Sequence, residues 1–357
     1  MVRVLETGGG DPGRIHAEGM AARVALEEAR DSVASLLGAR PRGVVFTSGA
    51  TEAIAAATWG ASERGGHQVV SAVEHSAVRE AAARSGAVSI VAVDRLGHVD
   101  PDDVIAAIRP DTCAVHVQWG NHEVGTVQPV AEVVAACRER GVLVHTDAAQ
   151  AAGHVPIAFD DIGADLCSVS GHKFGAPQGT GALLVRRGLR LRPLLMGGDQ
   201  ERARRAGMEN VPALVGLGAA ADALRAADSL EVEAVTARRL TDRVLAGVTG
   251  LDGVVAYGDP TNRVPHIVCL GVLDVEPQAV LLGLDRAGIA AHSGSACSSE
   301  ALEPSPVLEA MGVDAQRSLR ISVGWSTTDA DIDAFLSALP AVLDDLRRLG
   351  RGPTVVL

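Results

Sequence analysis

Short apolar segments alternate with alanine-rich segments over the first half of the chain, and this alternation is the strongest constraint on its fold. The predicted strands are Val44–Thr47, Gln68–Ala72, Val88–Val93, Cys113–Gln118, Leu143–Thr146, Leu166–Ser168 and Gly181–Val185. The predicted helices between them are Thr51–Trp59, Ala77–Arg84, Pro101–Ala107 and Val130–Arg140. Strands that are apolar along their whole length, separated by helices, indicate an α/β fold with a mostly parallel sheet covered on both faces.

The pattern changes after residue 210, where long helices come first and strands follow. The predicted helices are Ala213–Ala227, Leu230–Val248, Pro306–Met311 and Asp329–Asp344, and the predicted strands are Val264–Leu270 and Ile289–Ala291. A chain of 357 residues is long enough for two domains. We therefore predict a large domain over residues 1–236 and a smaller α+β domain over residues 237–357.

The composition excludes several classes of protein. With 47% hydrophobic and 21% charged residues, the chain can bury a substantial core. A net charge of −12 argues against direct nucleic-acid binding, which requires basic patches. No apolar run reaches the length of a membrane span, and the first residues lack the apolar core of a signal peptide. The five cysteines show no CxxC pair or metal-ligand spacing, so we expect no metal site and a reducing, cytoplasmic location.

Lys173 is the only lysine in the chain, and the other 31 basic residues are arginines. Arginine keeps its positive charge but does not deprotonate in proteins, so it cannot act as an amine nucleophile. Lysine can, and its usual covalent partner is a carbonyl carbon, with which it forms a Schiff base. Composition alone does not distinguish this role from the chance survival of one surface lysine, and the motif around Lys173 has to decide.

The segment Phe46–Ala53 follows a predicted strand and opens a predicted helix. Unpaired backbone N–H groups and hydroxyls at the start of a helix form a site for an anion such as a phosphate. The ordinary alternative is a Ser or Thr helix cap with a capping glutamate, here Glu52. Taken alone, the segment favours the ordinary alternative.

Two further polar segments follow predicted strands. Asp147 and Gln150 come just after Leu143–Thr146, and Ser170, His172 and Lys173 come just after the next strand. Binding residues in α/β sheets gather at the carboxyl ends of strands. A carboxylate at Asp147 can keep a pyridine nitrogen protonated, although an Asp that only caps the next helix is also common. Ser170 and His172 can hold a phosphate while Lys173 reaches an aldehyde.

The order of these motifs resembles the signature of cysteine desulfurases, which belong to the class V aminotransferase family of fold-type I enzymes that use pyridoxal 5'-phosphate (PLP). The resemblance covers essentially the whole chain. The segments that carry it are Thr47–Glu52, Glu74–Ala77, Asn121–Gly125, Asp147–Gln150, Ser170–Lys173, Gln200–Arg202, Gly294–Ser299 and Ser318–Ser322.

The resemblance implies a role for each of these residues. Ala50, Thr51, Ser170 and His172 would bind the cofactor phosphate. His75 would stack on the pyridine ring, Asp147 would pair with its nitrogen, Gln150 would contact O3′, and Lys173 would carry the cofactor. Asn121, which the resemblance places beside the cofactor, would hold the substrate carboxylate together with Arg320, whose fork of donors matches a carboxylate. Without the resemblance, His75 reads as an interior or helix-capping histidine.

Cys297 distinguishes the desulfurases from their aminotransferase relatives. It lies in the small, polar segment His292–Glu300, which follows a predicted strand, whereas the other four cysteines have apolar neighbours and are expected to be core residues. The resemblance implies that Cys297 takes sulfur from L-cysteine as a persulfide, leaves L-alanine, and passes the sulfur to an acceptor protein for iron–sulfur clusters or thio-modification.

We therefore expect a cytoplasmic, homodimeric cysteine desulfurase. One alternative is a selenocysteine or cystine lyase of the same fold, and another is a degenerate relative that binds partners without catalysis. Two departures from the family pattern prompt the second alternative. The usual N-terminal strand and loop are not apparent, and Met208 stands where the family has a threonine whose hydroxyl reaches the phosphate of the neighbouring subunit.

Overall fold

The structure is a computed structural model that describes residues 1–6, 10–293 and 304–350. The chain divides into two compact units. Unit 1 comprises residues 1–92, 99–120 and 128–232, and unit 2 comprises residues 93–98, 121–127 and the chain from residue 233 onward. The two units exchange segments along the chain, because residues 93–98 and 121–127 lie between parts of unit 1 in sequence but belong to unit 2.

Unit 1 is built on a seven-stranded sheet with strand order β1-β7-β6-β5-β4-β2-β3. Strands β2, β3, β4, β5 and β6 run parallel, and only β7 is antiparallel to its neighbours. The strands are β1 (Val44–Thr47), β2 (His67–Ser71), β3 (Ala87–Val91), β4 (Thr112–His116), β5 (Leu143–Asp147), β6 (Leu166–Ser170) and β7 (Gly181–Val185). The predicted mostly parallel α/β sheet is confirmed.

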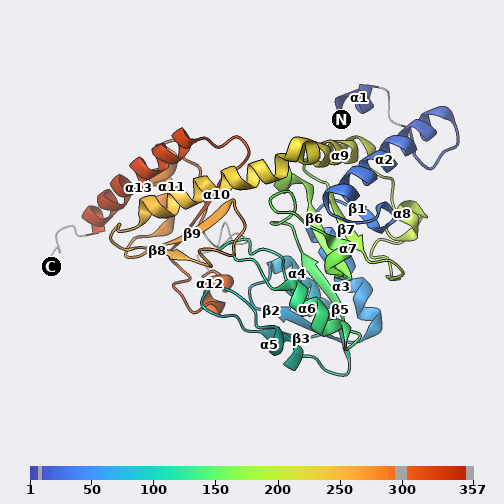
Figure 1. Cartoon of the computed structure of the whole chain (residues 1–357), viewed down its shortest axis with the longest axis horizontal. Coiled ribbons are helices and arrows are strands. Elements are labelled where there is room, and N and C mark those ends of the chain that lie inside the picture. The colour runs from blue at the N-terminus through green and yellow to red at the C-terminus, as the bar shows by residue number, and fades with distance from the viewer. Residues whose placement is uncertain (7–9, 294–303, 351–357) are drawn as a thin grey trace, which may run out of the picture. The chain divides into compact units, whose positions relative to one another are not determined.

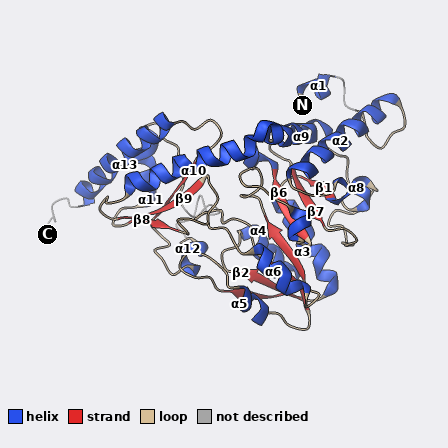
Figure 2. Ribbon diagram, in the orientation of Figure 1, coloured by secondary structure: helices blue, strands red, loops and turns tan. Residues whose placement is uncertain are grey.

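Helices pack on this sheet along most of its length (Figures 1 and 2). The helices of unit 1 are α1 (Val2–Glu6), α2 (Ala17–Leu36), α3 (Ala50–Ala61), α4 (Ser76–Ser85), α5 (Pro101–Ala106), α6 (Val130–Arg138), α7 (Phe159–Ile162), α8 (Gln200–Ala203) and α9 (Val211–Arg225). Helix α3 packs against β5, β6 and β7, while α2 packs along α9. Because helices cover the sheet, every residue of all its strands except β3 is buried, which is why the strands read as apolar runs.

Unit 2 contains a three-stranded antiparallel sheet with strand order β10-β9-β8. The strands are β8 (Val254–Tyr257), β9 (Ile267–Val272) and β10 (Ser318–Ser322), and the helices are α11 (Pro277–Arg286), α12 (Pro306–Ala310) and α13 (Asp329–Gly350). Helix α10 (Ser229–Val248) begins in unit 1 and continues in unit 2. Buried residues of β9, α11 and α13, among them Leu270, Leu284 and Leu339, form its core.

The prediction of a strand at Ile289–Ala291 is wrong, because these residues form an irregular segment after α11. They are followed by His292, which makes only an isolated β-bridge with Arg320. Of the three strands in the unit 2 sheet, β9 corresponds to the predicted strand Val264–Leu270, whereas β8 and β10 were not predicted. None of the described helices is both long enough and apolar enough to span a membrane.

Candidate active site

The carboxyl ends of four strands of unit 1 that run in the same direction carry residues singled out from the sequence. Strand β7 is antiparallel to both β1 and β6, so β1 runs in the same direction as β6. Ala50 and Thr51 therefore follow β1 at the edge of the sheet where His75 follows β2. Asp147 ends β5 and Ser170 ends β6 at the same edge. The topology thus gathers residues that are far apart in sequence.

Gly49, in the loop between β1 and α3, lies close to the end of β6. A Cβ atom built on Gly49 would lie 3.8 Å from the Ser170 hydroxyl, and one built on Gly181 would lie only 2.6 Å from the Gly49 Cα. Only glycine at position 181 therefore permits this close approach of β7 to the loop. The Ser170 hydroxyl also lies 3.0 Å from Nδ1 of His172. The start of α3, the Ser170 hydroxyl and the His172 ring are neighbours, as an anion site requires.

The first turn of α3 is ordered by a carboxylate rather than by a hydroxyl. Gly49 is the N-cap residue and has no side chain to cap the helix, so a Ser or Thr cap is not used. Instead, Glu52 accepts a hydrogen bond from the Ser48 N–H at 2.8 Å and pairs with Arg205 at 2.8 Å. Burial alone would raise the pKa of Glu52, but the hydrogen bonds from Arg205 and Ser48 hold that pKa below its ordinary value.

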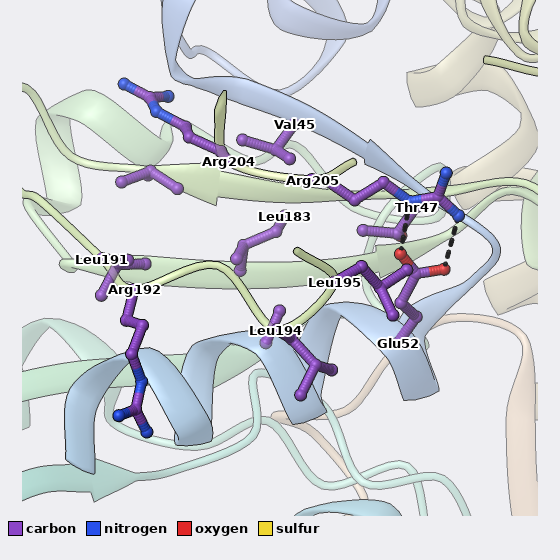
Figure 3. Close-up of a pocket in the computed structure, with 12 residues that line it drawn as sticks. Val45, Thr47, Glu52, Leu183, Leu191, Arg192, Leu194, Leu195, Arg204 and Arg205 are labelled. Carbon is purple, nitrogen blue, oxygen red and sulfur yellow. Dashed lines mark hydrogen bonds and ion pairs between the residues drawn. The ribbon is translucent and has the colours of Figure 1, made fainter. Parts of the chain in front are cut away.

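The Arg205–Glu52 pair borders a small hollow of about 20 Å³ beside α3 (Figure 3). Val45 of β1 and Leu183 of β7 line one side of it, and Leu191, Leu194 and Leu195 line another. The hollow is mostly apolar and contains none of the predicted cofactor-binding residues. We assign it a structural role, because the ion pair at its border fixes the loop that precedes α3.

Asp147 is a buried carboxyl group at the end of β5, with only 7% of its surface exposed. Burial raises the pKa of Asp147, whereas a hydrogen bond from the Ala149 N–H and the charge of Lys173 lower it. His75 and Lys173 both lie within electrostatic range of the Asp147 carboxyl. A buried carboxylate near a cationic group is suited to pairing with a cationic ring nitrogen.

His75 is the N-cap residue of α4, and its Nδ1 accepts a hydrogen bond from the Ala77 N–H at 3.0 Å. The helix-capping interpretation of His75 is therefore confirmed. Capping does not exclude a role at the site, because it fixes the ring. With Nδ1 acting as an acceptor, the hydrogen of the neutral ring is on Nε2.

Lys173 lies in a short 3₁₀ turn, Gly171–Phe174, immediately after β6, and is exposed. Its backbone carbonyl lies 2.9 Å from Nε2 of His154, which can donate to it. Burial and the charge of Lys173 lower the pKa of His154, although the hydrogen bond to the Lys173 carbonyl opposes them. Partial burial, assisted by the Lys173 charge, also lowers the pKa of His172. The neutral forms of His154 and His172 are thus favoured near the single lysine.

Asn121 and Arg320 belong to unit 2 and lie together there. The Asn121 side-chain oxygen accepts hydrogen bonds from the N–H groups of Glu123 and Val124, both at 2.8 Å. Arg320, on β10, donates to the carbonyl of His122 at 2.9 Å. Because the Asn121 side-chain oxygen is used within the turn, its amide nitrogen is the end of the side chain that can donate to a ligand. The next residue, His122, is held by the Arg320 guanidinium.

Gln150 is a buried residue of the turn that follows β5. Cys297 lies outside the described residues, and the other four cysteines are buried, as expected.

Sequence reasoning gave Glu74 no role, yet the structure buries its carboxyl group within electrostatic range of Asp147. The available signal was its position, because an acidic residue three positions after a buried strand and next to His75 is unusual in a covered sheet.

Comparisons with known proteins identify the family of this chain. The sequence profile described as "Aminotransferase class-V" matches residues 6–335. The cysteine desulfurase of Gluconacetobacter diazotrophicus is 42% identical over 353 residues, covering 95% of this chain and 88% of that protein. The cysteine desulfurase IscS of Dictyoglomus turgidum is 38% identical over 352 residues, covering 95% of this chain and 89% of that protein.

Solved structures show the same fold. A NifS-like protein superposes with a TM-score of 0.89 at 30% identity and covers 96% of this chain and 94% of its own. DndA from Streptomyces lividans superposes with a TM-score of 0.75 at 35% identity, covering 90% of this chain and 94% of its own. The resemblance read from the ordered motifs is confirmed. With a profile match over most of its length and relatives of this identity and coverage, the chain belongs to the class-V aminotransferase family.

Proposed function

We propose that this protein is a PLP-dependent cysteine desulfurase that converts L-cysteine to L-alanine and transfers the sulfur to Cys297 as a persulfide. The observation that carries the proposal is the position of Lys173. The only lysine of the chain is exposed at the carboxyl edge of the sheet, and its charge acts on the buried carboxyl of Asp147. Guanidinium groups cannot replace it there as nucleophiles.

The residues present fit the proposed cofactor. The start of α3, with no side-chain cap, and the Ser170 hydroxyl beside His172 supply donors suited to a phosphate. Asp147 would pair with the ring nitrogen, His75 would stack on the ring, and Gln150 would contact O3′. When bound, the cofactor supplies an electron sink for the bond-breaking at the substrate α-carbon. Lys173 would hold the cofactor covalently through Nζ and move the substrate α-proton.

Asn121 and Arg320 would orient the substrate through its carboxylate. The guanidinium of Arg320 provides paired donors, and the Asn121 amide adds another. The thiolate of Cys297 would then attack the substrate sulfur, so that a sulfur–sulfur bond forms while the carbon–sulfur bond breaks. The sulfur would leave on an acceptor protein, and we propose a cytoplasmic homodimer as the working form.

The test is to incubate the purified protein with PLP and L-cysteine and to measure alanine and protein persulfide together. We expect alanine to form, persulfide to appear on the peptide that contains Cys297, and borohydride reduction to yield a cofactor-modified peptide that contains Lys173. Lys173→Arg should abolish alanine formation. Cys297→Ser should abolish persulfide formation, whereas Ser298→Ala, in the same segment, should not.

Two outcomes would overturn the proposal. A Lys173 peptide that stays unmodified in protein saturated with PLP would refute the cofactor role. Alanine formed at the parental rate by Cys297→Ser would refute sulfur transfer to this cysteine and would favour a lyase that acts on selenocysteine or cystine.

A further inference from the structure

Glu74 carries a buried carboxyl group that has no place in the chemistry described so far. Only 1% of its surface is exposed. Its Oε1 accepts a hydrogen bond from the Gln118 N–H at 2.5 Å, and its Oε2 is buried and accepts no hydrogen bond from any described residue. The adjacent Val73 carbonyl accepts from Nε2 of Gln118 at 2.6 Å, so the Gln118 residue fixes this turn at two points.

Glu74 and Asp147 lie on opposite sides of one short backbone segment. The Gln118 N–H donates to the Glu74 carboxyl group, and the next N–H along the chain, that of Trp119, donates to the Asp147 carbonyl at 2.8 Å. Two consecutive peptide groups at the end of β4 therefore connect the end of β2 to the end of β5. This arrangement explains how residues 73 positions apart in sequence come to interact electrostatically.

The surroundings disfavour a negative charge on Glu74. Burial raises the pKa of Glu74 to about 8, and the Asp147 charge reinforces that effect. The Gln118 hydrogen bond and the charge of Arg79 act in the opposite direction and are too weak to cancel it. Asp147 differs, because the charge of Lys173 and a hydrogen bond from the Ala149 N–H favour its ionised form. Two buried carboxyls that interact electrostatically disfavour each other's ionisation, and the one near the lysine keeps the charge.

We propose that Glu74 is a positioning residue of the cofactor site, a neutral carboxylic acid that leaves Asp147 as the one anion of the pair. A single carboxylate is then available to pair with a single cationic ring nitrogen. The neutral Glu74 still accepts the hydrogen bond from the Gln118 N–H and so holds the segment after β4 in place, but it adds no second negative charge. The existence of the pair is independent of the proposed function, whereas its meaning for the cofactor rests on that function.

The pair can be tested in the cofactor-free protein by nuclear magnetic resonance with glutamate labelled with carbon-13 at the side-chain carboxyl. We expect one glutamate resonance to titrate with a midpoint near pH 8, in line with the pKa of about 8 for Glu74. Glu74→Gln should remove this resonance, and Asp147→Asn should shift its midpoint downward by removing the neighbouring charge. Glu80→Gln, a change on the exposed face of α4, should leave it in place.

A second measurement separates charge control from simple packing. A carboxyl whose pKa is higher in the folded than in the unfolded protein loses stability as the pH rises from its ordinary value, 4.5, to about 8. Glu74→Gln should therefore gain in urea midpoint relative to the parent at pH 9 and lose that gain at pH 5. A Glu74 resonance that titrates near pH 4.5, or a stability difference that does not vary with pH, would overturn the proposal. Neither readout requires cofactor or turnover, so failure of the desulfurase proposal would remain distinguishable.

Discussion

At the scale of single residues, burial decides which groups of the site are charged. Asp147 is buried, and its pKa is raised by that burial even though the Ala149 N–H and Lys173 act against it. Its carboxylate is therefore held at a cost to the folded protein, and a cationic partner would recover part of that cost. The same burial keeps His154 neutral beside Lys173. The site thus places one buried carboxyl group within electrostatic range of an exposed lysine.

Asp147→Asn tests this reading of Asp147. The amide is the same size but cannot pair as an anion, so we expect PLP affinity to fall by about 1.5–3 kcal/mol, roughly tenfold to a hundredfold. The cofactor-free protein should keep or gain stability, because a group whose charge is disfavoured has been replaced. Equilibrium binding of PLP and urea unfolding measure the two effects. Asp161→Asn, on the exposed side of α7, is the control, and equal affinity in both variants would contradict the expected role.

At the scale of elements, a chain of hydrogen bonds crosses four strands of the unit 1 sheet inside the core. Gln68, His116, His145 and Ser168 come from β2, β4, β5 and β6 and are fully buried. Nε2 of His116 lies 2.7 Å from Oε1 of Gln68, Nδ1 of His116 lies 3.0 Å from Nδ1 of His145, and Nε2 of His145 lies 2.8 Å from the Ser168 hydroxyl. Because the Gln68 amide oxygen only accepts, Nε2 of His116 donates to it, and Nδ1 of His116 then accepts from Nδ1 of His145. Nε2 of His145 in turn accepts from the Ser168 hydroxyl, so each ring carries one hydrogen and both rings are neutral.

Protonation of either ring would set two N–H groups against each other, so the pH dependence of stability is predictable. Burial lowers the pKa of His116 from 6.5 to about 4, and burial together with the charge of His116 lowers the pKa of His145 well below its ordinary value. A depressed histidine pKa means that the unfolded chain takes up the proton first. Stability is then lost as the pH falls from 6.5 towards 4, by about 3 kcal/mol for His116.

Urea unfolding at pH 7.5, 6 and 5 measures this loss, and His116→Gln should show a shallower decline than the parent. Because Glu74 titrates with the opposite sign, the difference between variant and parent isolates the histidine contribution. A variant whose stability declines as steeply as that of the parent would contradict the assignment of a neutral histidine pair.

The buried ion pair between α2 and the segment at α8 gives a second prediction at this scale. Arg30 donates to both carboxylate oxygens of Glu201, at 2.7 and 2.8 Å, and Glu201 also accepts from the Phe46 N–H at 2.9 Å. Glu201 has a φ of +48°, a conformation that its hydrogen bonds hold in place. Arg30→Met should cost about 3–5 kcal/mol of unfolding free energy, because it leaves Glu201 buried without its partner.

Arg23, an exposed arginine on the same helix, provides the control for that experiment. Its closest nitrogen–oxygen distance to Glu27 is 3.7 Å, and the half-buried Glu27 keeps its ion pairs with Arg30 and Arg202 when Arg23 is replaced. Arg23→Met should therefore change the free energy of unfolding by about 0–1 kcal/mol, as measured by urea denaturation. Equal effects of the two substitutions would show that the burial of the Arg30 pair has no energetic consequence.

The sequence predicted the elements whose apolar pattern is local and missed those that depend on distant partners. Strands β1 and β7 have the predicted bounds, because burial on both faces makes them apolar throughout. Strand β10, Ser318–Ser322, alternates polar and apolar residues and exists because it pairs with β9. The places of Asp147 and Ser170 at strand ends were predictable, because β5 and β6 are also apolar segments that the local pattern reveals. The pairing of Glu74 with Gln118 was not, because no local pattern encodes it.

At the scale of the whole molecule, the two units exchange short segments of chain that sequence order does not reveal. Residues 121–127 follow β4 of unit 1 but belong to unit 2. The Val127 N–H donates to the Asn262 carbonyl at 3.0 Å, and the Gly125 carbonyl accepts from the Val264 N–H at 2.9 Å. These hydrogen bonds join residues more than a hundred positions apart. A single boundary at 236/237 cannot describe such an exchange, so the division into domains at that point stays a prediction. The exchange places Asn121 on the same unit as Arg320.

The homodimer proposed for this chain leads to a prediction at Met208, where the family pattern has a threonine that reaches the phosphate of the neighbouring subunit. Met208 is 63% exposed in the single chain, and its thioether cannot donate a hydrogen bond to a phosphate. Met208→Thr should strengthen PLP binding by about 1.5–3 kcal/mol, roughly tenfold or more, because it restores a hydrogen bond to a charged group. Dissociation of PLP during dialysis, followed by absorbance, measures the change. Met196→Thr is the matched control, since Met196 is 76% exposed and the family resemblance assigns it no such contact. If light scattering shows a dimer and the two substitutions leave PLP retention equally unchanged, the side chain at position 208 does not reach the phosphate across the subunit interface.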